Sequence, residues 1–185
     1  MNKYLSNKKG YTLVEMVIVI CIIAILAVMS LVSVTIINSA RAKNACIRIG
    51  SEINEVKTKS KVMTTAGSDG YGLVVYKDGN NVINCCTALY DKSANTYTLV
   101  SDSNVVMSST VDVKFTGTRK KYSDLTTTET VNDELVTDLS SDPLLITFNK
   151  KGNCLSGYGD ICFYKKNGTQ VARIHITSNG SVDVR

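Results

Sequence analysis

Apolar residues are distributed unevenly along this chain of 185 residues. From Met16 to Ala40 the sequence contains no Lys, Arg, Asp, Glu or His. A helix of that length measures roughly 37 Å, and the hydrocarbon core of a bilayer is about 30 Å thick. The run therefore predicts a transmembrane helix over residues 11–40, long enough to cross the bilayer with some tilt.

After Ala40 the apolar pattern becomes periodic. Apolar residues recur at three- and four-residue steps, and charged residues occupy the rest of the helical wheel. This pattern predicts that the helix continues as an amphipathic segment over residues 41–61 and packs against a globular domain. Its only glycine, Gly50, costs about 1 kcal/mol relative to Ala and is expected to soften the helix locally. The inward-facing positions are Ala42, Cys46, Ile49, Ile53 and Val56.

The remaining residues, 62–185, have the short alternating runs of β-strands. Strands are predicted at 73–76, in part of 82–89, at 97–100 and at 111–115, and the glycine-rich residues 67–72 are predicted to form a loop. The C-terminal third predicts a four-stranded antiparallel meander that includes 144–148, 161–163, 171–176 and 182–184. Asn167-Gly168 and Asn179-Gly180 are the expected hairpin turns, because Asn and Gly accept positive φ angles. The predicted fold class is α+β, with one long N-terminal helix packed on an antiparallel β-sheet domain.

Residues 116–142 form a polar insertion rich in Ser and Thr. A short helix is possible at 132–139, with Asn132 as its cap and Leu135, Val136 and Leu139 facing inward. Two interpretations remain open for this segment. It is either a solvated excursion or a surface shown to a partner, because loops on rigid scaffolds often carry binding sites.

The net charge of +5 owes much to Lys3, Lys8 and Lys9, which no acid balances in the first ten residues. A basic flank before an apolar span places the N-terminus in the cytoplasm and residues 41–185 outside. A general nucleic-acid binder usually has a basic stripe over its folded part, so this charge distribution argues against nucleic acid as a partner.

Two simple explanations of the N-terminus are unsatisfactory. Ala40-Arg41-Ala42 resembles a signal-peptidase site, but the apolar run is far longer than the 7–15 residues of a secretory signal. A plain membrane anchor suits the length and the flanks, yet it leaves Glu15 unexplained. A carboxylate at that position costs about 2–3 kcal/mol if it enters the bilayer, so it needs a cationic partner.

The string Lys8-Lys9-Gly10-Tyr11-Thr12-Leu13-Val14-Glu15, followed at once by the apolar run, resembles the N-terminus of type IV prepilins and type II secretion pseudopilins. The resemblance implies a pilin-like fold and a basic leader, residues 1–10, that a prepilin peptidase removes between Gly10 and Tyr11. It also implies N-methylation of the Tyr11 amine and a role for Glu15 in assembly. The span lacks the proline that kinks many type IVa pilins.

The same resemblance implies a structural subunit that polymerises into a type IV pilus or a type II secretion-like filament. The implied partners are the prepilin peptidase, an inner-membrane platform protein, a cytoplasmic assembly ATPase, other pilin subunits and the lipid bilayer. The expected location is the cytoplasmic membrane and then a cell-surface filament. The C-terminal sheet also resembles that of minor pilins and minor pseudopilins, which favours a minor subunit, although the sequence leaves open major or minor and the kind of machine.

The alternative is a filament-tip or membrane-tethered binding module, either an adhesin or a DNA-uptake pilin. It would act through residues 116–142 or through the last hairpin. That hairpin carries Asp183 where a phosphate-binding site would need a base, so DNA capture is disfavoured.

The sequence offers no arrangement typical of an enzyme. His175, the only histidine, lies between Ile174 and Ile176 on a predicted strand and is expected at the surface. No Ser or Cys has a recognisable base, and no zinc or calcium pattern is present. We therefore expect no enzymatic activity, no cofactor and no metal.

Of the six cysteines, Cys21 lies inside the predicted span. Cys154 with Cys162 would close a small loop and stabilise the domain by about 2–3 kcal/mol. Cys46 with Cys85 or Cys86 would link the domain to its helix. The alternative that all five outer cysteines stay reduced is equally open, because it depends on the redox environment.

Overall fold

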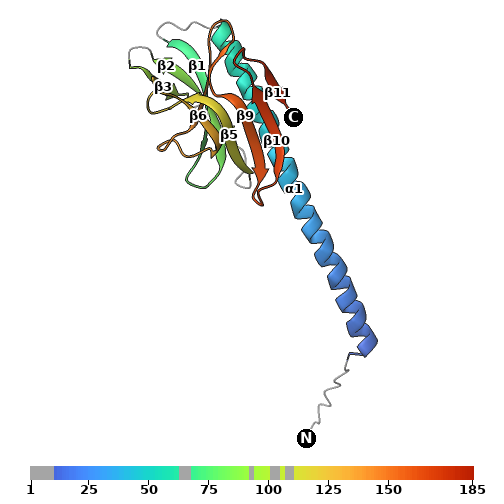
Figure 1. The fold of residues 1–185 in the computed structure, drawn as a ribbon. Coiled ribbons are helices and arrows are strands. Elements are labelled where there is room, and N and C mark those ends of the chain that lie inside the picture. Colours follow the sequence, from blue (N-terminus) through green and yellow to red (C-terminus); the bar gives the residue numbers. More distant parts are fainter. Residues whose placement is uncertain (1–10, 63–67, 92–93, 101–104, 107–110) are drawn as a thin grey trace. The chain divides into compact units, whose positions relative to one another are not determined.

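The structure, a computed structural model, describes residues 11–62, 68–91, 94–100, 105–106 and 111–185 (Figure 1). It confirms the α+β prediction, with one long N-terminal helix and antiparallel sheets. The chain divides into two compact units, which are residues 1–37 (unit 1) and residues 38–185 (unit 2). Helix α1 contributes to both units. The elements are α1 (Leu13–Val62), β1 (Ser68–Lys77), β2 (Ile83–Asp91), β3 (Thr96–Leu99), β4 (Val105–Val106), β5 (Val111–Lys120), β6 (Thr128–Leu135), β7 (Leu144–Phe148), β8 (Cys154–Ser156), β9 (Tyr158–Lys165), β10 (Gln170–Ile176) and β11 (Val182–Val184).

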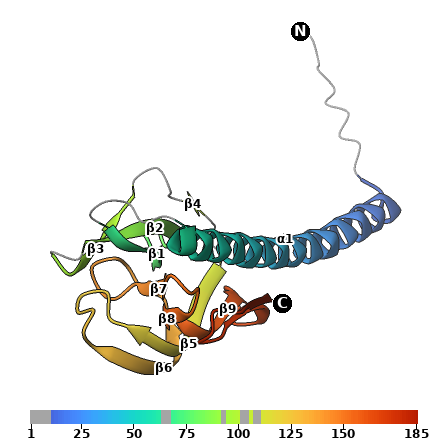
Figure 2. The same cartoon turned by 90° about the horizontal axis from the view of Figure 1, so that it is seen from above.

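Unit 2 contains two antiparallel sheets, which Figure 2 shows beside the C-terminal part of α1. Sheet A has the strand order β3-β2-β1-β7-β8, and β4 also pairs with β2. Sheet B has the order β11-β10-β9-β5-β6. Because β5 lies between β6 and β9, the middle of the chain and its C-terminal third build sheet B together.

The main core lies between α1 and the two sheets. The five helix positions predicted to face inward are all at most 1% exposed, which confirms the predicted amphipathic face. The strands supply alternating inward residues, for example Val111, Val113 and Phe115 of β5. A second, smaller cluster lies on the other face of sheet A and includes Val74, Ala88 and Leu145. The central strands of sheet A are therefore buried on both faces.

Gly50 has a packing role that the sequence did not reveal. Helix α1 continues through Gly50, and a Cβ built there would lie 2.8 Å from the Cγ2 atom of Val184 on β11. A side chain at this position would force Val184 to move, so its absence lets the last strand approach the helix.

The C-terminal hairpins turn at the predicted places. The amide of Gly168 donates to the carbonyl of Lys165, and the amide of Gly180 donates to the carbonyl of Thr177, both at 2.8 Å. The two glycines have φ angles of 81° and 80°. The asparagines before them are not among the described residues with positive φ, so these are three-residue loops with glycine alone in the left-handed region.

The prediction of a single four-stranded meander was wrong. β9, β10 and β11 do form a meander in sheet B, but β7 pairs with β1 and β8 in sheet A. The chain changes sheets at Gly157, whose φ of 80° lets it turn sharply between β8 and β9. Alternation shows which face of a strand is buried but not which sheet it joins, because both sheets bury their inner faces in one core.

The predicted loop at 67–72 was also wrong for most of its length. Gly67 lies outside the described residues, but β1 begins at Ser68 and includes Gly70, Tyr71 and Gly72. Gly72 lies within β1, and a Cβ there would lie 3.0 Å from Cε1 of Tyr97. The absence of a side chain at Gly72 therefore leaves room for the tyrosine ring.

The polar insertion at 116–142 does not contain the expected helix. Its middle is β6, an edge strand of sheet B with mostly exposed side chains. The flanking residues Tyr122, Leu125 and Leu139 pack on the second cluster of sheet A. Val136 is buried in the main core, whereas Leu135 is exposed. An edge strand needs few inward apolar residues, so its composition resembles that of a loop.

Arg119 links separate parts of the insertion to one another. Its guanidinium is only 2% exposed and forms ion pairs with three carboxylates. The N–O distances are 2.9 Å to Glu129, 3.1 Å to Glu134 and 2.9 Å to Asp142. The polar segment is therefore ordered by its own ion pairs, and no local sequence pattern indicates a buried arginine.

Candidate functional site at the start of the helix

Two of the predicted site residues, Tyr11 and Glu15, lie at the beginning of α1. Tyr11 precedes the helix and is 76% exposed. Glu15 is exposed in the first helical turn. The leader residues Lys3, Lys8, Lys9 and Gly10 lie outside the described residues.

Thr12 caps the helix and links these two residues. The backbone N–H of Glu15 donates to Thr12 Oγ1 at 3.2 Å, and the N–H of Met16 donates to the Thr12 carbonyl at 3.2 Å. Thr12 is thus the N-cap, and Glu15 is the third helical residue. The spacing Thr-x-x-Glu is that of a capping box, a pattern that is visible in the sequence itself. It makes Thr12 part of the site.

The cap also determines the electrostatic environment of Glu15. A carboxylate in the first turn lies near the positive end of the helix dipole, which typically stabilises it by about 0.3–1 kcal/mol. The site therefore presents a carboxylate at the N-terminal end of a long apolar helix.

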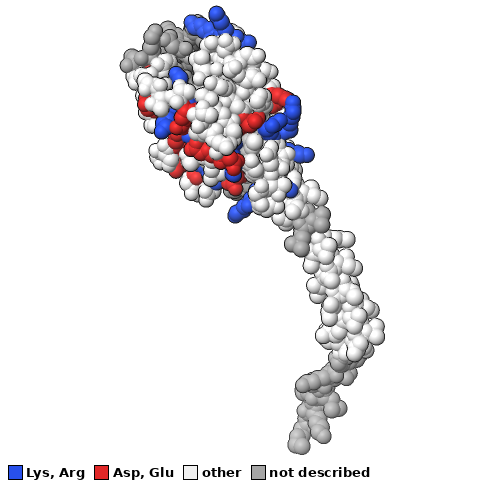
Figure 3. All heavy atoms as spheres, viewed as in Figure 1, with Lys and Arg blue, Asp and Glu red and all other residues white. Residues whose placement is uncertain are grey.

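The apolar surface that follows is not buried within unit 1. Large apolar side chains such as Ile20, Ile23 and Leu26 are more than half exposed, although each would favour removal from water. Figure 3 shows this stretch free of charged side chains. Among the described residues, α1 is the helix with the length and composition to cross a membrane.

A comparison with protein-family models finds a match at this end of the chain. Residues 5–31 match the model of the prokaryotic N-terminal methylation motif. The chain therefore carries the N-terminal signal of type IV pilins and pseudopilins. No curated protein and no solved structure matches the chain significantly.

The six cysteines are all free thiols in the structure. Burial raises the pKa of Cys46 to about 11 and the pKa values of Cys85 and Cys154 to about 12. Raised pKa values keep these thiols protonated and poorly nucleophilic at neutral pH. They behave as small apolar side chains of the core.

The structure contains neither of the two suggested disulfides. Cys154 is buried in the main core, whereas Cys162 is half-buried and alternates with the inward-facing Ile161 and Phe163 of β9. Cys85 belongs to the same core cluster as Cys46, and Cys86 points to the opposite face of β2. If a bridge to the helix forms, the fold favours Cys85 over Cys86; both pairings stay predictions.

His175 lies on the outer face of sheet B, as predicted. Its side chain is 45% exposed, and its Nδ1 lies 2.8 Å from Asp160 Oδ1. Among the described residues, no three His, Cys, Asp or Glu side chains are close enough to hold a metal ion.

Proposed function

We propose that this chain is a filament subunit that polymerises into a type IV pilus or a type II secretion-like filament. One observation carries the proposal: a capped first turn presents Glu15 directly before an apolar helix surface that unit 1 does not bury. Such a surface requires an external partner. The bilayer supplies it before assembly, and the helices of other subunits supply it afterwards.

Processing by a prepilin peptidase fits this helix start. Cleavage between Gly10 and Tyr11 removes Lys3, Lys8 and Lys9 and creates a new α-amine, which is then methylated. Tyr11 precedes the cap, so cleavage leaves Thr12 and the first turn intact. The loss of three cytoplasmic charges makes the helix easier to extract from the membrane.

Glu15 acts in the assembled filament by pairing with the Tyr11 amine of a neighbouring subunit. An isolated charge in an apolar filament core is costly, whereas two opposite charges that pair there become tolerable. The pairing sets the axial register between subunits. The exposure of both residues at the helix start leaves them accessible to a neighbour.

The proposed partners are the prepilin peptidase, an inner-membrane platform protein, an assembly ATPase acting from the cytoplasm, and other pilin subunits. The chain first spans the cytoplasmic membrane with its N-terminus inside and then enters a surface filament. We favour a minor subunit.

The assembly role of Glu15 is tested with Glu15→Gln, which keeps the size of the side chain and removes its charge. The variant is expected to reach the membrane at wild-type levels and to fall at least tenfold in sheared filaments, both measured by immunoblot. Glu55→Gln is the matched control, because Glu55 is an exposed acid on the same helix within unit 2. Normal filament levels of Glu15→Gln would refute the role.

The alternative function, a filament-tip or membrane-tethered binding module, needs a different surface. The arrangement of residues 116–142 speaks against a separate binding loop, because Val136 is buried in the main core and Leu125 in the second cluster of sheet A. In the last hairpin, Asp183 pairs with Arg185, which argues against a site for phosphate there.

A further inference from the structure

Within unit 2, strand β10 runs alongside α1 in the same direction as the helix. Lys43 and Ile47 of the helix and Val171 of β10 line one shallow hollow of about 260 Å³. Further along both elements, a Cβ built at Gly50 would lie 3.9 Å from the Cδ1 atom of Ile174. The start of β10 therefore lies beside the part of α1 that enters unit 2.

The turn between β9 and β10, residues 166–169, projects towards the lower-numbered end of this helix segment (Figure 1). The amide of Lys165 donates to the carbonyl of Thr169 at 2.9 Å and closes the hairpin. The tip of the turn thus lies roughly two to three strand residues beyond Val171, which is about 7–10 Å. An α-helix covers that distance in about five to seven residues. The tip is therefore at about the level of Arg41.

Four cations gather at this level. Arg41 and Lys43 are exposed on either side of the buried Ala42, because successive helical residues are about 100° apart. In the hairpin, Lys166 is exposed and Lys165 is half-buried. We call Arg41, Lys43, Lys165 and Lys166 the basic collar, since they occupy the end of unit 2 at which the helix enters.

The basic collar has no counter-ion in the described part of the chain, because none of its four members forms an ion pair there. Two acids on the neighbouring strands already have partners. Asp112 of β5 pairs with Lys77 at 2.9 Å, and Asp183 of β11 pairs with Arg185 at 2.7 Å. Uncompensated cations on one surface attract an anionic partner.

The place of the collar along the chain indicates which partner. The apolar run ends at Ala40, and Arg41 and Lys43 follow within about 4.5 Å of helix. The headgroup layer on each side of the hydrocarbon core is about 5–7 Å thick. When the apolar run spans a bilayer, the collar therefore lies at headgroup depth, where long basic side chains reach lipid phosphates. The bilayer itself keeps a dissolved nucleic acid away from this level.

We propose that the basic collar binds the anionic headgroups of phospholipids in the leaflet next to unit 2. Arg41 and Lys43 contribute the helix part of the contact, and Lys165 and Lys166 contribute the hairpin part. The contact holds unit 2 against the membrane before assembly and is broken when the helix is extracted. The inference rests on the membrane-spanning stage of the proposed function and adds a lipid partner for unit 2.

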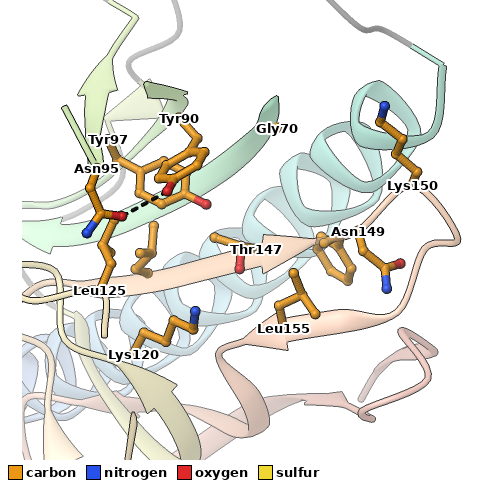
Figure 4. A pocket seen from close by; sticks show the side chains of 12 residues that line it. Gly70, Tyr90, Asn95, Tyr97, Lys120, Leu125, Thr147, Asn149, Lys150 and Leu155 are labelled. Carbon is orange, nitrogen blue, oxygen red and sulfur yellow. Dashed lines mark hydrogen bonds between the residues drawn. The ribbon is translucent and has the colours of Figure 1, made fainter. Parts of the chain in front are cut away.

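The chain offers a matched control for the hairpin lysines. Lys150 and Lys151 also precede a glycine and an asparagine, in the turn between β7 and β8. That turn packs through Gly152 against Lys61, about 30 Å along the helix from Arg41. Lys150 lines a pocket on the second face of sheet A (Figure 4), so it lies outside the collar.

The test measures which lipid the protein immobilises. The full chain is reconstituted in phosphatidylcholine bilayers with a trace of spin-labelled phosphatidylglycerol or spin-labelled phosphatidylcholine, and electron paramagnetic resonance gives the immobilised fraction of each label. We expect the wild type to prefer phosphatidylglycerol at least about twofold at low salt. The preference should decrease in about 0.5 M NaCl, because salt screens exposed charges.

The variants locate the preference on the collar. Lys165→Gln/Lys166→Gln should lower it at least about 1.5-fold, whereas Lys150→Gln/Lys151→Gln, which loses the same charge, should change it less than about 1.1-fold. A second collar variant, Arg41→Gln/Lys43→Gln, should act like the first. The leader lysines are present in every chain and do not affect the comparison.

The outcomes separate this inference from the proposed function. Near-ultraviolet circular dichroism establishes that the variants keep the wild-type fold. Immobilised lipid without a preference for phosphatidylglycerol, or equal losses in the collar variants and the control, would overturn the lipid contact alone. Absence of immobilised lipid of either kind would contradict the membrane-spanning stage of the proposed function and the lipid contact with it.

Discussion

Ile25 and Ile53 occupy the same helix, yet they are in opposite environments. Ile25, in unit 1, is 57% exposed, whereas Ile53, in unit 2, is fully buried against the sheets. Unit 2 buries its apolar residues within its own fold, as a stable domain does. Unit 1 presents them to something outside the chain. One continuous helix thus combines a self-sufficient half with a half that is completed only by lipid or by other subunits.

The largest expected loss of stability in unit 2 comes from removing the buried guanidinium of Arg119. Arg119→Met should lower the free energy of unfolding by about 3–5 kcal/mol, because it leaves three carboxylates without their cation. Urea unfolding of the full chain in detergent, followed by near-ultraviolet circular dichroism, measures the loss.

The matched control for Arg119 is Arg173→Met, on the same sheet. Arg173 is partly exposed, and its Nε lies 3.7 Å from Asp160 Oδ1, so its loss should cost less than about 1 kcal/mol. Equal stabilities of the two variants would show that the ion pairs of Arg119 do not stabilise the insertion.

The next largest effect is expected from Ile53→Ala, and its comparison with Ile25→Ala contrasts the stabilities of the two units directly. Ile53→Ala removes buried methyl groups and should destabilise unit 2 by about 2–5 kcal/mol. Ile25→Ala removes the same groups from an exposed position and should change the same unfolding transition by less than about 0.5 kcal/mol. Similar losses in both variants would contradict the separation of the two units.

The smallest effect concerns the buried thiols at high pH. The pKa of Cys85 rises from 9.0 in the unfolded chain to about 12 in the fold, so the unfolded state loses its proton first. The contribution of this thiol is therefore complete below pH 9 and is lost as pH rises towards 12. Between pH 9 and 10.5 the loss should be about 1–2 kcal/mol for this residue.

The thiol effect is measured as a difference between two pH profiles. Cys85→Ala lowers stability at all pH values because it leaves a small cavity, but its stability should fall less steeply above pH 9 than that of the wild type. Parallel profiles in urea unfolding would show that Cys85 is not protonated in the fold at high pH.

The sequence predicted the parts of the fold that depend on local repetition. The helix face of Ala42, Cys46 and Ile49 and the alternation of Val111, Val113 and Phe115 follow from the periods of a helix and a strand. The glycines at 168 and 180 indicated turns because few other residues take their φ angles. The start of the helix could also be predicted from the sequence, because a glycine, a capping threonine and a glutamate directly precede the apolar run.

Other features depend on contacts between distant residues, which local patterns do not contain. Gly50 contacts Val184 near the other end of the chain, and Arg119 pairs with carboxylates 10 to 23 positions away. The switch of sheets at Gly157 depends on the pairing of β7 with β1 and of β9 with β5. The expected helix at 132–139 was wrong because β6 at 128–135 is an edge strand, which carries few of the apolar residues that indicate a strand.

The most direct test of the account is mass spectrometry of the N-terminus of this protein isolated from cells. A processed pilin predicts a chain that begins at Tyr11 with a methyl group on its amine. A chain that still begins at Met1, or one that begins at Lys43, would contradict the account.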